Sequence, residues 1–244
     1  MEIALILFGL TASVLLGGAL VVYLQRSQNE RLIKLLLAFS GGFLLSIAFI
    51  HFIPELYENS HSKIGMYILI GFLIQLILEF FSGGIEHGHI HTHEGAKLPV
   101  MLIVALSFHA FIEGVPLGSQ LAGMEIATQH QHGQDHSLFL GILFHRLPVA
   151  IALMTLLTVA KVGNAKAWFY LTIFAVISPL GVLLGFNSTE LLEGFNFNII
   201  LAIVVGMFLH ISTTIIFETS ENHKFNFIKL LSIFVGCAIA FLIH

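Results

Sequence analysis

Three ionisable residues in two otherwise apolar stretches have side chains that suit a divalent metal ion. His109 and Glu113 lie near the middle of residues 98–122, and His145 lies within residues 137–160. A separation of four residues places His109 and Glu113 on one face of a helix. Two imidazoles and one carboxylate suit Zn²⁺, and also Fe²⁺, Mn²⁺ or Co²⁺. Because ionisable groups are costly at the centre of an apolar helix, we interpret the three as a functional metal site.

The two stretches can bring these residues to one depth. His109 lies eleven residues from the start of its stretch, and His145 lies eight residues from the start of the next one. At about 1.5 Å per residue, two antiparallel helices therefore place both near the middle of a hydrocarbon layer of about 30 Å. Pro116 and Pro148 each free a backbone carbonyl four residues earlier, which adds polarity beside the site. The spacing predicts a metal site inside the membrane.

The composition predicts an all-α polytopic membrane protein. Of the 244 residues, 57% are hydrophobic and only 10% are charged, against about a quarter charged in a soluble domain. Eight apolar stretches are long enough to be transmembrane helices, and they leave no room for a separate soluble domain. We therefore expect one transmembrane domain over residues 1–244. The expected spans are residues 3–24, 32–57, 64–82, 98–122, 137–160, 167–187, 191–217 and 225–243.

The basic residues predict the orientation of these spans. Eight of the ten Lys and Arg residues flank the odd-numbered loops, which places those loops in the cytoplasm and both termini outside. The first span lacks a basic leader, so we interpret it as retained rather than cleaved. Compact loops favour a prokaryotic inner membrane. The net charge of −4 argues against nucleic acid as a partner, and the lone Cys237 excludes a disulfide framework.

Further histidines suggest additional metal contacts along the chain. His51 and Glu55 are four residues apart near the predicted outer surface, where they could receive incoming cations; a polar helix end at the lipid headgroups is the alternative. Residues 83–97 form a predicted cytoplasmic His-rich loop that could capture metal, or else a solvated linker. Its alternating histidines are His87, His89, His91 and His93.

The seventh predicted span carries a second set of polar residues. His210 and Glu218 mark a candidate polar pathway through it. The favoured alternative makes His210 a hydrogen-bonded interior residue. For Glu218, and for Glu79 near the end of the third span, we expect a solvated role at the cytoplasmic helix ends.

These motifs resemble those of the ZIP family of zinc/iron transporters. The segment HAFIEG, residues 109–114, is similar to the family's His-x-x-x-Glu-Gly signature, and His145 with Pro148 is similar to its His-x-x-Pro. FIHFIPE and GMFLHIS resemble its second-span and seventh-span motifs. The resemblance implies uptake of divalent metal into the cytoplasm without an organic cofactor. It also implies a homodimer in which spans one, four, five and six move against the others.

The chain departs from the family at a second metal site. Many members carry further ligands where this chain has Ala110, Arg146, Val149 and Ile215. A second metal site therefore looks dismantled. We hypothesise that the Arg146 guanidinium, which stays protonated, takes the place of the second metal and pairs with Glu113. The alternative is an arginine that snorkels or bonds backbone carbonyls.

The sequence thus favours a secondary transporter of divalent metal, zinc first, and not an enzyme. A membrane metal sensor or buffer that does not transport remains open, because the second set of ligands is missing. An intramembrane zinc hydrolase is a weaker alternative: it could use the same three ligands, but it would need a general base, and the chain has no HExxH motif.

Overall fold

Every regular element of the described chain is helical. This computed structural model describes residues 2–23, 30–58, 63–82, 100–123, 137–191, 196–217 and 227–243. The elements are α1 (Glu2–Tyr23), α2 (Glu30–Ile47), the π-helical turn η1 (Ala48–Phe52), α3 (Ile53–Glu58), α4 (Ile64–Ser82), α5 (Val100–Leu121), α6 (Ser137–Val159), α7 (Asn164–Leu191), α8 (Asn198–Phe217) and α9 (Phe227–Ile243).

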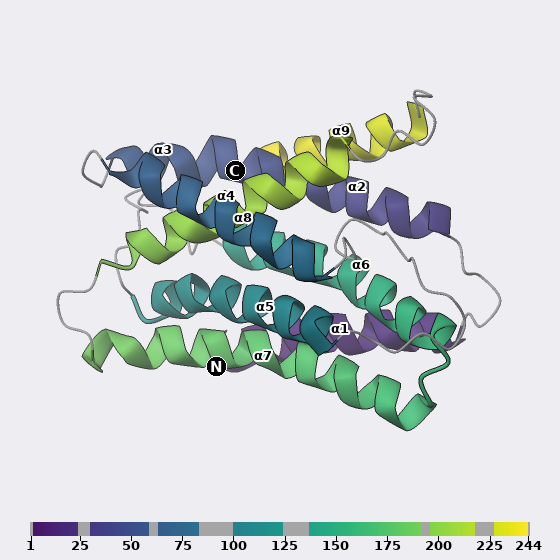
Figure 1. The fold of residues 1–244 in the computed structure, drawn as a ribbon. Coiled ribbons are helices and arrows are strands. Elements are labelled where there is room, and N and C mark those ends of the chain that lie inside the picture. The colour runs from purple at the N-terminus through teal and green to yellow at the C-terminus, as the bar shows by residue number, and fades with distance from the viewer. Residues whose placement is uncertain are drawn as a thin grey trace.

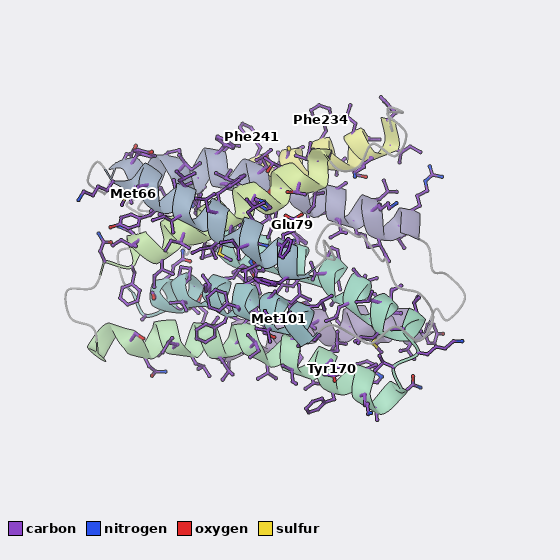
Figure 2. The ribbon with its side chains drawn as sticks, in the orientation of Figure 1. Met66, Glu79, Met101, Tyr170, Phe234 and Phe241 are labelled. Atoms are coloured by element: carbon purple, nitrogen blue, oxygen red, sulfur yellow. The ribbon has the colours of Figure 1, made fainter. Side chains whose placement is uncertain are left out.

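The helices have the length and surface of membrane spans. Seven of them are long and apolar enough to cross a bilayer, counting α2, η1 and α3 as one helix, and α9 is an apolar helix of 17 residues. Large apolar side chains cover the outside: Phe234 and Phe241 on α9 are 60% and 66% exposed, and both project away from the bundle in Figure 2. Such a surface suits lipid, so the all-α polytopic prediction is confirmed.

The helices group into two units, according to which helices pack against one another. α5 packs mainly on α7, and α1 packs on α6 and α7; we call these four helices the site unit. α2 packs mainly on α9, and α4 packs on α8; these helices, with η1 and α3, form the companion unit. In Figure 1 the companion unit fills the upper part of the view and the site unit the lower part. Within the site unit, α6 is the helix that lies next to the companion unit. The two units meet mainly through α2 against α6 and α4 against α5.

Glycines bring α5 and α7 into close contact. A Cβ atom added at Gly114 or Gly118 would overlap the backbone oxygen of Ser178 or Val182 on α7. A Cβ atom added at Gly181 would likewise overlap a backbone oxygen of α5. Small residues allow this close approach in membranes, where van der Waals packing holds helices together. The pair therefore forms a firmly packed base for the residues that α5 carries.

The boundary between the sixth and seventh predicted spans was wrong. We expected the seventh span to begin at residue 191, but α7 continues to Leu191 and α8 begins at Asn198. Asn187 and Ser188 can lie within α7 because their side chains donate to the carbonyls of Leu183 and Leu184, so their polar groups have partners inside the helix. The α8 start is fixed by Asn196, whose side-chain oxygen accepts a hydrogen bond from the Asn198 N–H.

Candidate metal centre

His109, Glu113 and His145 converge on one buried point between α5 and α6. His109 is the tenth residue of α5 and His145 the ninth of α6, so both lie near the middle of their helices. The Nε2 atom of His109 lies 2.7 Å from Oε1 of Glu113, and the two imidazole rings lie 6.0 Å apart, nearly perpendicular. One ligand atom from each of the three residues lies within 4.8 Å of the others. The sequence-predicted cluster is therefore assembled.

The geometry of the cluster suits a first-row divalent ion. All three residues are at most 3% exposed. Tetrahedral zinc with bonds of about 2.0–2.2 Å needs donor atoms about 3.3 Å apart, so the three donors need only small shifts to share one ion. Three ligands leave a fourth position open for water or another donor. A partly open set of borderline ligands can bind and release an ion rather than hold it permanently.

Arg146, beside His145 on α6, extends toward α7 instead of forming the expected pair with Glu113. It is 1% exposed, and its Nη2 atom donates a 2.8 Å hydrogen bond to the carbonyl of Phe174. The guanidinium carbon lies 4.9 Å from the centre of the Phe174 ring. Its Nε and Nη1 atoms have no hydrogen-bond partner among the described residues. The hydrogen bond to the α7 carbonyl matches the alternative that Arg146 bonds backbone carbonyls, rather than the hypothesised contact with Glu113.

His51 and Glu55 form a separate pair on the α2–α3 helix. Their Nε2 and Oε1 atoms lie 3.6 Å apart, and both residues are nearly buried. His51 lies within η1, where the N–H of Ile53 bonds the carbonyl of Ala48, one residue further back than in an α-helix. Single π turns inside α-helices occur frequently at functional sites. We did not predict this turn, although Pro54, which directly follows Ile53, lacks the N–H that a regular helix would use here.

His210 of α8 lies against α4 and is far in sequence from His109, Glu113 and His145. Its Nδ1 atom lies 3.2 Å from Oε2 of Glu79, and its ring lies edge-on to Phe72 at 4.7 Å. His210 is buried, and Glu79 is partly buried, with its side chain 17% exposed. The expectation of a solvated Glu79 was therefore wrong, because α8 supplies a buried imidazole to pair with it.

Two sets of predicted residues cannot be placed. His87, His89, His91 and His93 of the His-rich loop, and Glu218 after α8, lie outside the described residues.

Comparison with known proteins identifies the family. The ZIP zinc transporter family model matches residues 2–100 and 85–244, which together span nearly the whole chain. The chain belongs to the ZIP zinc transporter family. Zinc transporter ZIP9 of Micropogonias undulatus is 25% identical over 169 residues, covering 64% of this chain and 51% of the relative. Zinc transporter ZIP1 of Danio rerio is 22% identical over 210 residues, covering 66% and 67%. The chain spans about half the length of the ZIP9 relatives it matches.

Three of the four positions at which the family resemblance implies additional ligands are filled here by apolar core, and Arg146 is the fourth. Ala110, Val149 and Ile215 are each at most 2% exposed and pack in one hydrophobic cluster. None of these side chains has an atom that can bind a metal. Among the described residues, His109, Glu113 and His145 are the group whose ligand atoms lie close enough together to hold a metal ion.

Proposed function

We propose that this ZIP family member carries divalent metal ions, zinc first and iron, manganese or cobalt as alternatives, into the cytoplasm as a secondary transporter. The buried cluster of His109, Glu113 and His145 at mid-helix depth carries this proposal. Such a set is costly to bury without a partner ion, and its borderline ligands suit these metals. Membership of a transporter family, rather than an enzyme family, sets aside the intramembrane hydrolase.

The remaining polar residues suggest a path to and from this centre. His51 and Glu55 would receive the ion on the outer side, and the His-rich loop of residues 83–97 would take it up in the cytoplasm. His210 and Glu218 would lie along the inner part of the path. The basic residues support this direction, since they favour a cytoplasmic position for the odd-numbered loops.

The movement would involve the two units. Both helices that carry ligands belong to the site unit, and the contacts that join it to the companion unit are less extensive than those of the closest helix pairs, α5 with α7 and α2 with α9. This arrangement supports a cycle in which the site unit moves against the companion unit with its ion. A homodimer would hold the companion units still. The host membrane that we propose is a prokaryotic inner membrane, although the relatives named above are vertebrate proteins.

The proposal is tested by transport in proteoliposomes. Uptake of Zn²⁺, Fe²⁺ and Mn²⁺ is measured for the wild type, for His109→Ala and for the control Phe108→Ala, whose side chain is 47% exposed on the same helix. We expect saturable uptake that survives in the control and is lost in His109→Ala. Binding without uptake in the wild type would favour the sensor or buffer. Uptake that survives in His109→Ala would refute the assigned centre.

A further inference from the structure

The buried charges of the site unit sum to zero. Among its described residues, Glu113 and Arg146 are the two buried side chains that carry a formal charge when the histidines are neutral. One contributes −1 and the other +1. We count both imidazoles as neutral, because burial disfavours the charged form and a neutral ring still offers one donor and one acceptor nitrogen. The metal-free centre therefore has no net charge in the part of the unit that is shielded from water.

The two charges act on each other without touching. Arg146 is anchored to α7 by its hydrogen bond to the Phe174 carbonyl and by the Phe174 ring, and it directly follows His145, which lies in the same cluster as Glu113. The carboxylate is therefore left facing His109, 2.7 Å away, and stays available to an ion. An arginine that paired directly with Glu113 would compete with the metal for the same oxygen atoms. The bond to α7 prevents that competition while keeping the positive charge close.

Building on the proposed transport function, we infer that Arg146 is a tethered counter-cation that lets the metal-free site unit return across the membrane without carrying net charge. A bare carboxylate would make the empty unit negative, and an unpaired buried charge is strongly unfavourable. With Arg146 present, the loaded centre carries +2 and the empty centre carries none. The membrane potential then drives the loaded step and has no effect on the return.

If Arg146 balances the charge of Glu113, removing either charge should produce a charge movement in the absence of metal, and the two movements should have opposite signs. Voltage steps are applied to clamped cells that express the full chain, with divalent metals removed by a chelator. The wild type should give no transient charge movement above background. Arg146→Met should give a transient of up to one elementary charge per molecule, and Glu113→Gln should give one of the opposite sign. The double variant E113Q/R146M and the charge-conserving Arg146→Lys should both lack the transient.

The voltage dependence of zinc uptake is a second test. It uses only the wild type, so it does not depend on whether a variant folds. One elementary charge crossing the full field changes a rate or equilibrium by about tenfold per 60 mV. At saturating outside zinc, uptake should therefore rise with negative potential and then reach a plateau, because the uncharged return step becomes limiting. Uptake that keeps rising steeply without a plateau would contradict the inference.

The outcomes separate the inference from the proposed function. Equal transients in the wild type and Arg146→Met, transients of the same sign in Arg146→Met and Glu113→Gln, or no transient in either single variant at normal surface abundance would each overturn the counter-cation. Absence of zinc uptake by the wild type would instead overturn the transport proposal. Zinc uptake measured in the same cells therefore distinguishes the two failures.

Discussion

At the scale of single residues, the side chain that distinguishes this centre is a positive charge beside a site for positive ions. Arg146 repels an incoming divalent ion, while Glu113 attracts it. We therefore expect Arg146→Ala to bind Zn²⁺ about tenfold more tightly, a change of about 1.4 kcal/mol, and to turn over more slowly. Equilibrium binding of the purified protein and initial uptake rates measure the two effects.

Lysine provides the matched control at this position. Arg146→Lys keeps the charge but loses the planar group that bonds the Phe174 carbonyl and stacks on its ring. We expect its affinity for zinc to stay near that of the wild type. If Arg146→Ala leaves both affinity and turnover unchanged, the guanidinium has only a packing role.

At the scale of the elements, the closest helix pair should be the least tolerant of added volume. Gly118→Ala places a methyl group against the backbone oxygen of Val182, which cannot move aside as a side chain can. Overpacking of this kind typically costs about 1–3 kcal/mol, so we expect a lower unfolding temperature in detergent and weaker zinc binding at the centre on α5.

Gly9→Ala in α1 is the comparison for Gly118→Ala. There the added methyl group meets the ring of Phe139, a side chain that can shift. Alanine is also the better helix former, so the stability should be unchanged or slightly higher. Equal losses in the two variants would show that the backbone contact between α5 and α7 is not what matters.

The contact between the buried His210 and the partly buried Glu79 should help to hold α8 against α4. Glu79→Ala removes one partner and leaves the imidazole buried without it, at a cost of about 1–3 kcal/mol. Thermal unfolding of the detergent-solubilised protein measures this, with Phe80→Ala as control because Phe80 is 84% exposed. In a double-mutant cycle with His210→Ala, a coupling energy near zero would mean that the two side chains act independently.

The structural features that depend on a pattern along the chain were predictable from the sequence. The apolar lengths predicted the helices, and i,i+4 spacing with matched depth predicted the meeting of His109, Glu113 and His145. Contacts between residues that are far apart in the sequence were not predicted. The carbonyl that holds Arg146 belongs to α7, and any residue type at position 174 offers one, so no sequence signal marks it. Glu79 looked solvated because His210 lies 131 positions away in the chain.

At the scale of the whole molecule, the proposed orientation can be tested with single cysteines. In a Cys237→Ser background, Lys63→Cys should react with an impermeant maleimide added outside, and Lys166→Cys only after the membrane is opened. Both lysines are exposed, and the Cys237 thiol bonds the Gly42 carbonyl between α9 and α2, a contact that serine can keep. The reverse labelling pattern would invert the topology and the proposed direction of transport.

Because of the π turn η1, this helix should be able to lose one residue there without a change in how its two ends pack. Because the Ile53 N–H reaches back five residues to Ala48, this turn contains one residue more than an α-helical turn. Deleting Phe49, which is 59% exposed, should restore a regular helix while Leu44 before it and Leu56 after it keep their places in the core. A one-residue deletion elsewhere in the same 28-residue helix would instead rotate everything beyond it by about 100°. Chains of this kind that differ in length by one residue here should therefore share the same packing, with His51 presented differently.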